Sequence, residues 1–178
     1  MGHLNVADFS SILSRVKLVP AVYIETGCNR GDQLVVAAQM GFARMTGIEL
    51  DERYAAEAAQ RVKTASVRVG DTSALLPAIL TAINEPVFII LDAHYCKLDP
   101  PIAKSRFPLW DELKLLRARS YADIIVVDDV HTFGKARDDL RYASEPEWET
   151  VTGTSISAFL GAPGETIGDG YVVWRTAR

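Results

Sequence analysis

The sequence lacks several features that would place it in particular protein classes. It has only two cysteines, Cys28 and Cys96, and they do not form a CxxC pair, so we expect reduced thiols. No apolar run approaches the roughly 20 residues that a membrane-spanning helix needs. The N-terminus has no basic segment followed by an apolar one, which is the pattern of a secretory signal. These absences predict a cytoplasmic protein without a membrane partner.

The sequence also lacks the excess of positive charge that is typical of nucleic-acid-binding proteins. Its net charge is −4 and it has no basic tail, so we expect no nucleic-acid partner. Hydrophobic residues make up 48% of the chain and charged residues 24%, as in ordinary globular domains. Because the chain has 178 residues and no repeat or linker, we expect residues 1–178 to form one domain.

Helix-like and strand-like segments alternate along the chain. The expected helices cover residues 1–19 (amphipathic from 4 to 19), 31–40, 51–63, 73–84, 109–119 and 134–143. The expected strands cover residues 21–26, 43–50, 66–70, 87–91, 124–127, 147–152 and 170–176. This order predicts an α/β fold with a Rossmann-like, doubly wound, mostly parallel sheet and helices on both faces. Residues 96–108 contain three prolines and are predicted to form a lid loop.

Acidic residues follow each of the five expected parallel strands. They are Glu25, then Glu49 with Asp51, then Asp71, then Asp92, then Asp128 with Asp129. The carboxyl ends of parallel strands lie at one edge of a sheet, where such folds bind their ligands. Converging carboxylates repel one another unless a cation, a donor-rich ligand or solvent compensates. We therefore expect a ligand site at this edge.

The turn after the first strand favours one kind of ligand. Gly27 and Gly31 allow a tight turn and a close approach of the backbone to a ligand. The dinucleotide fingerprint G-x-G-x-x-G is not met, because Asn29 and Asp32 stand at its second and third glycine positions. A pyrophosphate would fit such a turn poorly, and Glu25 adds negative charge beside it. The turn is better suited to an adenosine cofactor that carries an amino group and a sulfonium.

The next two acids extend this site. Glu49 lies 22 residues after Gly27, close to the offset of about 20 at which a strand-end acid binds ribose hydroxyls. Asp71 is then placed to bind an adenine amino group. The alternative is that these acids, like Asp51 and Thr72, simply cap the helices that follow them.

Four motifs together resemble the class I S-adenosylmethionine-dependent methyltransferases over residues 20–176. The motifs are residues 25–31 (ETGCNRG), 47–49 (GIE), 70–71 (GD) and 91–95 (LDAHY). The resemblance implies a sheet of about seven strands, the last antiparallel, and S-adenosylmethionine (SAM) as cofactor. It implies that the cofactor is bound by Glu25, Gly27, Asn29, Gly31, Glu49, Asp71 and Asp92.

Asp92, Asp128 and Asp129 also resemble the metal-binding acids of small-molecule O-methyltransferases. Hard carboxylate oxygens suit Mg²⁺ or another divalent cation. Such an ion would orient an acceptor hydroxyl and lower its pKa. The alternative is that Asp128 and Asp129 bind neighbouring backbone groups and turn the chain.

Two histidines offer a route without metal. His94 and His131 each follow a central strand, and imidazole titrates near neutrality, so either could act as general base. With Asp92 they are our catalytic candidates, although a lone histidine is usually structural or solvated. We expect methyl transfer to a hydroxyl of a small molecule. Acceptor binding would rest on the lid, the N-terminal helix and a second subunit of a homo-oligomer.

Two other function classes remain open from the sequence. One is an NAD-dependent oxidoreductase or a nucleotide-sugar enzyme on a Rossmann fold, against which Asn29 and Asp32 argue. The other is a SAM-binding module without catalysis. Candidates for contacts with the acceptor lie in or beside the predicted lid, and they are Tyr95, Lys97, Lys104, Arg106 and Phe107. The alternative is a solvated loop, which we favour for the charged residues.

Overall fold

A computed structural model describes residues 4–94, 107–132 and 151–175 of the chain. Its strands are β1 Val22–Thr26, β2 Arg44–Glu49, β3 Ala65–Val69, β4 Val87–Leu91, β5 Ile124–Val127, β6 Gly164–Ile167 and β7 Gly170–Trp174. Its helices are α1 Val6–Leu13, α2 Asp32–Gln39, α3 Glu52–Arg61, α4 Thr72–Thr81, α5 Leu109–Ala118 and α6 Gly153–Leu160, with a 3-10 turn, η1, at Val130–Thr132.

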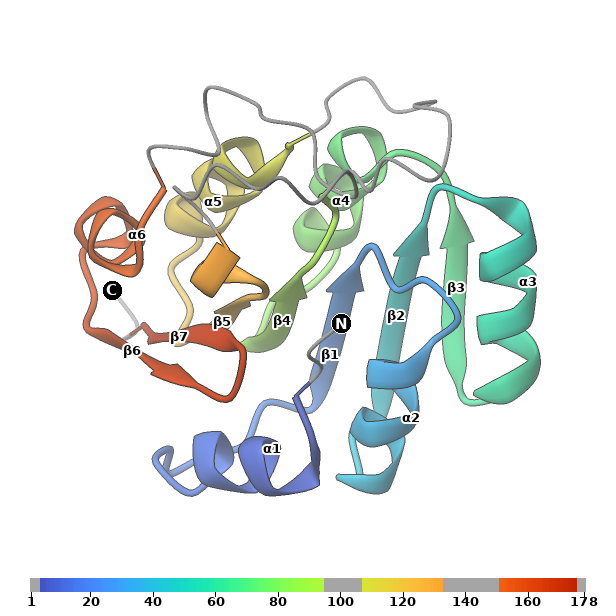
Figure 1. The fold of residues 1–178 in the computed structure, drawn as a ribbon, viewed down its shortest axis with the longest axis horizontal. Coiled ribbons are helices and arrows are strands. Elements are labelled where there is room, and N and C mark those ends of the chain that lie inside the picture. Colours follow the sequence, from blue (N-terminus) through green and yellow to red (C-terminus); the bar gives the residue numbers. More distant parts are fainter. Residues whose placement is uncertain (1–3, 95–106, 133–150, 176–178) are drawn as a thin grey trace.

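The seven strands form one sheet in the order β3-β2-β1-β4-β5-β7-β6 (Figure 1). β1 lies at the centre and pairs in parallel with β2 on one side and β4 on the other. β7 runs antiparallel to both of its neighbours, β5 and β6. The expected doubly wound, mostly parallel sheet is confirmed, and the carboxyl ends of β1 to β5 lie at one edge.

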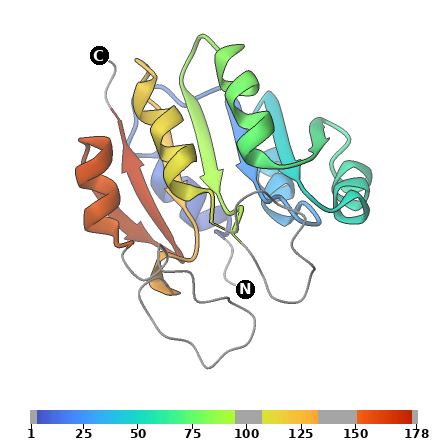
Figure 2. The same cartoon turned by 90° about the horizontal axis from the view of Figure 1, so that it is seen from above.

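Helices cover both faces of the sheet, as Figure 2 shows from a second side, and a hydrophobic core lies between the helices and the sheet on each face. Alternate strand residues point to opposite faces, so Ile24 and Ile89 lie in one core and Tyr23 and Phe88 in the other. Helices α4, α5 and α6 pack on the first face, and α1, α2 and α3 on the second. β4 and β5 are buried along their whole length because both faces are covered.

An aromatic cluster anchors α1 to the sheet. Phe9 of α1 stacks on Phe88 of β4 with ring centroids 5.1 Å apart. Tyr23 and Phe42 lie against the same rings, with centroids 5.4 to 6.5 Å apart. Offset and edge-to-face aromatic pairs at these distances stabilise a core beyond the area that they bury.

The structure corrects two sequence predictions. The N-terminal helix is shorter than residues 4–19, because α1 begins at the capping box of Asn5 and ends at Ser14. The residues after it precede Pro20, which disfavours helical backbone in the residue before it. At the other end, residues 151 and 152 are not strand, since Thr152 caps α6 through Ser155. The sequence-based interpretation missed both α6 and β6.

Some predictions fall on segments that the structure does not describe. One is the lid predicted over residues 96–108, of which the structure describes only Phe107 and Pro108. The residues singled out there that lie outside the described part are Tyr95, Cys96, Lys97, Lys104 and Arg106. The helix predicted over 134–143 and residues 147–150 are the others. These stay predictions.

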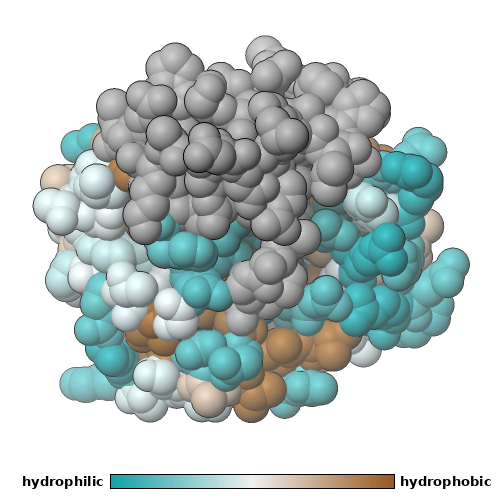
Figure 3. All heavy atoms as spheres, in the orientation of Figure 1, coloured by the Kyte–Doolittle hydropathy of each residue, from teal (hydrophilic) through white to brown (hydrophobic). Residues whose placement is uncertain are grey.

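The surface of the protein is uneven in polarity. In residues 4–94, 107–132 and 151–175, the exposed large hydrophobic side chains are Val6, Leu18, Val19 and Val69. Figure 3 shows hydrophobic residues in the lower part of this view, where α1 and α2 lie, and hydrophilic residues over α3. None of the helices in residues 4–94, 107–132 and 151–175 is long and apolar enough to cross a membrane.

A buried charge network closes the edge opposite the carboxyl ends. Asp123 is fully buried and accepts a hydrogen bond from the Val87 backbone N–H at 3.0 Å. The guanidinium of Arg119 donates to Asp123 at 3.0 Å, and that of Arg175 lies 3.5 Å from the same carboxylate. Arg119 also donates to the Leu80 carbonyl near the end of α4. The network ties β4, β5, β7, α4 and α5 together.

We predict that Asp123→Ala destabilises the fold by about 3–5 kcal/mol, because it leaves two buried guanidinium groups without their carboxylate. Urea denaturation followed by circular dichroism measures the free energy of unfolding. Asp111→Ala is the control, since Asp111 forms an exposed pair with Lys114 and such pairs contribute little. Equal effects of the two substitutions would contradict the structural role of the network.

Candidate functional site

The turn after β1 is built from left-handed backbone. Gly27, Asn29 and Gly31 have φ of +70°, +46° and +81°. A Cβ added at Gly27 would lie 2.3 Å from the Asp92 carbonyl oxygen, so no side chain fits there. The glycine therefore allows the β1 turn and the end of β4 to meet in direct backbone contact.

Glu49 holds this turn against the end of β2. One of its carboxylate oxygens accepts the Asn29 backbone N–H at 2.7 Å, and the other accepts the Asp51 N–H at 2.9 Å. Burial raises the pKa of Glu49, although these bonds act against the rise. A carboxylate has about four acceptor positions, so both oxygens can also accept hydroxyl donors. The structure thus gives Glu49 a structural role that is compatible with the predicted ribose contact.

Helix α3 braces the outer side of the turn. Arg61 donates from Nη1 to the Arg30 carbonyl and pairs with Asp32, both at 2.7 Å. The Arg30 guanidinium lies over the Tyr54 ring, 5.1 Å from its centroid. Asp32, which breaks the dinucleotide pattern, therefore points to α3 rather than to a phosphate position.

Two of the predicted acids cap helices, as the alternative interpretation held. Asp51 accepts the Arg53 N–H and caps α3, and Asp71 accepts the Ser73 N–H at 2.8 Å and caps α4. Beside this cap, the buried Ser73 hydroxyl has no hydrogen-bond partner among the described residues. Thr72 is not a cap. Contact of Asp71 with an adenine stays a prediction.

Four of the predicted acids, Glu25, Asp92, Asp128 and Asp129, gather at the ends of β1, β4 and β5; Asp92 is partly buried and the other three are almost fully buried. Glu25, Asp128 and Asp129 are 2%, 3% and 5% exposed. Burial raises the pKa of Asp92 well above its usual value, and the charges of Asp128, Asp129 and Glu25 raise it further. Burial also raises the pKa of Glu25, against a hydrogen bond from the Tyr23 hydroxyl at 3.1 Å. The expected gathering of acids at one edge is confirmed for these four.

His94 lies between two of these acids. Its Nδ1 is 3.2 Å from Asp92 Oδ1, and its Nε2 is 3.2 Å from Asp129 Oδ2. Asp129 reaches this position with φ of +55°, which an aspartate adopts more readily than most residues. Each imidazole nitrogen of His94 therefore faces one carboxylate.

The other catalytic and metal predictions are less supported by the geometry. His131 is exposed in η1. Asp128 accepts the Asp129 backbone N–H at 2.9 Å, as its structural alternative predicted. Within residues 4–94, 107–132 and 151–175, no three histidine, cysteine or acidic side chains are arranged to hold a metal ion. Metal binding by Asp92, Asp128 and Asp129 stays a prediction.

Cys28, in the same turn, has no evident chemical role. It is 2% exposed, and burial raises the pKa of its thiol further above neutrality. Its sulfur fills the space beside Gly47, where an added Cβ would lie 2.7 Å from Sγ. Cys28 is therefore a core residue of the turn.

The sequence-based interpretation missed Glu112 of α5. Glu112 is 2% exposed and accepts a hydrogen bond from the Thr72 hydroxyl at 2.8 Å. Burial raises its pKa to about 7, although bonds from Thr72 and Thr26 lower it. The pattern held a signal: Glu112 stands in line with Leu109, Leu113 and Leu116, as a carboxyl on the apolar face of a helix.

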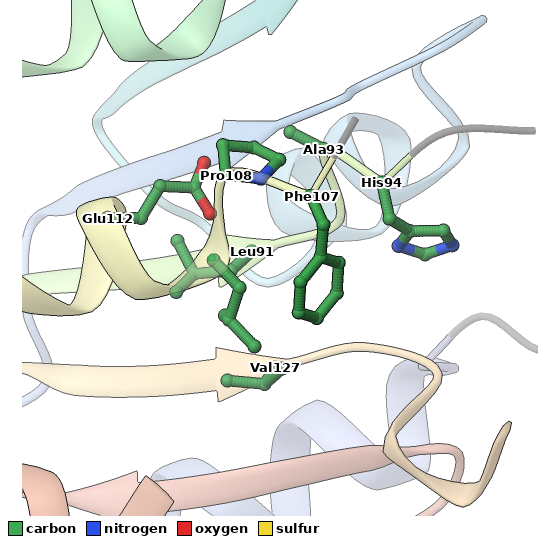
Figure 4. A pocket seen from close by; sticks show the side chains of 8 residues that line it. Leu91, Ala93, His94, Phe107, Pro108, Glu112 and Val127 are labelled. Atoms are coloured by element: carbon green, nitrogen blue, oxygen red, sulfur yellow. The ribbon is translucent and has the colours of Figure 1, made fainter. Parts of the chain in front are cut away.

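Glu112 and His94 line the same small cavity, of about 10 Å³, which is close to the room that one water molecule needs. Its other walls are apolar and come from β4, β5 and the start of α5. In Figure 4 the Glu112 carboxyl and the His94 ring lie at opposite ends of the lining, with the Phe107 ring between them. The cavity therefore lies between His94, which is beside the acid cluster, and Glu112 of α5.

The raised pKa of Glu112 leads to a prediction on stability. The folded-state pKa of about 7 exceeds the usual 4.5, so the folded protein holds this proton more tightly than the unfolded chain. This contribution is complete below pH 4.5 and is lost as the pH rises through 7, about 3 kcal/mol in all. We therefore expect Glu112→Gln to gain stability relative to wild type between pH 4.5 and 8.

Urea denaturation at several pH values in this range measures the difference between the two proteins. Asp111→Asn makes the same chemical change at an exposed neighbour on α5, and its difference from wild type should vary little with pH. A difference between Glu112→Gln and wild type that stays constant over the range would contradict the pKa assignment.

Comparison with known proteins finds solved structures that share this fold. No protein-family model and no curated protein sequence matches the chain. Among solved structures, a SAM-dependent methyltransferase from Archaeoglobus fulgidus aligns with TM-score 0.57 and 13% identity, over 96% of this chain and 92% of that one. The methyltransferase domain of bacterial CtHen1 aligns with TM-score 0.56 and 16% identity, over 95% and 96%.

The N-terminal domain of EvdMO1, solved with S-adenosylhomocysteine (SAH) bound, aligns with TM-score 0.54 and 15% identity, over 97% of this chain and 79% of that domain. Identities this low are evidence for the fold rather than for the reaction. The strand order, the antiparallel β7 and these alignments all indicate the same fold. The chain has the fold of the SAM-dependent methyltransferases.

Proposed function

We propose that this protein transfers a methyl group from SAM to a hydroxyl of a small molecule. The observation that carries the proposal is the edge of the sheet at which the Gly27 turn, Glu49 and the buried acids meet. Solved methyltransferases share the fold. Buried carboxylates without a bound cation are costly, and this edge is where α/β sheets bind ligands.

The residues fit the chemistry of this cofactor. SAM carries an ammonium and a sulfonium, and Glu25, Asp92 and their neighbours supply negative charge in a buried setting. Glu49 has acceptor positions for ribose hydroxyls at the end of β2. At the start of α4, the carboxylate of Asp71 offers a polar contact to the base. A pyrophosphate would meet repulsion at the same place, which argues against NAD.

When bound, SAM supplies an electrophilic methyl group, and the protein must position and deprotonate the acceptor. His94 is the residue that we assign to the proton. Its Nε2 exchanges the contact with Asp129 for the acceptor hydroxyl and takes up the proton there. Asp92 stays on Nδ1, fixes the ring and stabilises the imidazolium that results. Much of the rate would come from alignment of the two reactants.

Metal assistance is a second route to the same deprotonation. A divalent cation bound by Asp92, Asp128 and Asp129 would displace His94 from between two of these acids. Carboxylate oxygens are suitable ligands for Mg²⁺. The two routes differ in what they require, and chelation distinguishes them.

We predict that SAH raises the melting temperature of the protein and that NAD⁺ does not. A ligand that binds only the folded state adds about 2.7 kcal/mol at a concentration of 100 Kd. Differential scanning fluorimetry with SAH, NAD⁺ or buffer measures the shift. Glu49→Gln is expected to reduce it, because the uncharged amide is a weaker acceptor for ribose hydroxyls. No shift with millimolar SAH would end the proposal.

We predict that His94→Ala lowers methyl transfer about 100-fold or more while SAH binding is retained, because general-base catalysis contributes on this scale. His131→Ala is the matched control, because His131 is exposed in η1, after β5. This variant should keep most of the activity. Transfer of labelled methyl groups from SAM to a panel of hydroxylated acceptors measures turnover.

Two outcomes would revise the assignment. Full activity of His94→Ala would remove His94 as the base. Loss of activity in EDTA, with recovery on addition of Mg²⁺, would favour the metal route through Asp92 and its neighbours over the histidine route.

A further inference from the structure

One buried carboxyl, that of Glu112, connects separate parts of the candidate cofactor site. Its Oε1 accepts the Thr72 hydroxyl at 2.8 Å. The Thr26 hydroxyl lies near enough to the Glu112 carboxyl to lower its pKa as well, by less than Thr72 does. All three side chains are buried: Thr26, Thr72 and Glu112 are 0%, 7% and 2% exposed. The bonds are therefore shielded from competing water.

The two threonines stand where the site is built. Thr26 is the last residue of β1 and directly precedes Gly27. Thr72 is the first residue of α4 and directly follows the cap Asp71. The Asp92 backbone N–H donates to Thr26, at 3.1 Å to its carbonyl oxygen and at 3.3 Å to its hydroxyl. Glu112 is thus bonded to the start of α4 through Thr72 and lies beside Thr26, which in turn is bonded to the end of β4.

A purely structural position would not require a carboxyl here. The neighbours of Glu112 on its helix face are leucines, and the cavity beside it is lined mainly by apolar side chains. A leucine or methionine would bury apolar surface without the cost of desolvating an acid. The sheet already joins β1 to β4 through its backbone ladder. What the carboxyl adds is a fixed orientation of the two threonines and of the residues beside them.

We propose that Glu112 is a positioning residue of the cofactor site, which aligns the Gly27 turn, the Asp71 cap and the Asp92 strand end through Thr26 and Thr72. This inference rests on the proposed SAM function and adds a part of the machinery on α5, outside the four motifs. Glu112 itself need not contact the cofactor. It acts by fixing the orientation of the backbone and side chains that contact the cofactor.

The test compares SAH affinities of folded variants by isothermal titration calorimetry. Glu112→Ala removes the carboxyl that Thr72 bonds and that lies beside Thr26, and it is expected to weaken SAH binding roughly ten- to hundredfold, as loss of supporting partners does at other sites. Glu112→Gln keeps an acceptor for Thr72 and a polar contact for Thr26, and it should bind nearly as tightly as wild type. Thr72→Val removes one hydroxyl at constant shape and should weaken binding while Glu112 is intact.

The double variant Glu112→Ala/Thr72→Val provides the decisive comparison. If Glu112 acts through Thr72, the combined loss should be smaller than the sum of the single losses, because both changes break one network. Asp111→Ala on the same helix is the control and should leave affinity unchanged. Should Glu112→Ala fail to fold, Thr72→Val and Glu112→Gln still test the proposal, since each preserves volume.

The outcomes separate the two proposals. Wild-type affinity in folded Glu112→Ala, or fully additive losses in the double variant, would overturn the positioning role while SAM binding stands. Failure of Glu112→Gln to rescue the loss in Glu112→Ala would also overturn it. Absence of SAH binding by the wild-type protein itself would remove the proposed function and this inference together.

Discussion

The candidate site depends on one close backbone contact, between the turn after β1 and the end of β4. Gly27 has no side chain and a left-handed φ, so the Asp92 carbonyl can lie where a Cβ would otherwise be. This contact sets the position of the acids that follow both strands. Any larger residue at position 27 would separate the two strand ends and open the acid cluster to water. The glycine is therefore a requirement of the site as much as of the turn.

Burial gives the acids at this edge their chemical character. Desolvation raises the pKa of Glu25 and Asp92, and their mutual repulsion adds to the rise of Asp92. His94 lies between two of these acids, with one ring nitrogen 3.2 Å from Asp92 and the other 3.2 Å from Asp129. At the opposite edge, the buried carboxylate of Asp123 is paired with two guanidinium groups, those of Arg119 and Arg175. One edge is thus satisfied from within the chain, and the other is suited to a cationic ligand.

Sequence patterns predicted the local parts of this arrangement well. Continuous apolar runs predicted β4 and β5, and acids directly after the strands predicted which residues would gather at one edge. The same reasoning failed at α6, where a strand was expected over residues 147–152 and no helix after it, although Thr152 and Ser155 form a capping box. For Asp71 the structure shows the helix cap, and the predicted contact with an adenine stays a prediction. A short polar residue before a helix carries the same signal in both roles.

The sequence alone determined the order of strands and helices from α1 to β5, the glycine turn and the set of strand-end acids, because each depends on neighbours within a few residues along the chain. Only the tertiary structure decided that His94 bridges two acids, that Glu49 holds the turn, and that Glu112 reaches Thr72 across 40 positions. These contacts join residues from different elements. Their geometry is set by how α5 and α4 pack on the sheet, which no local pattern specifies.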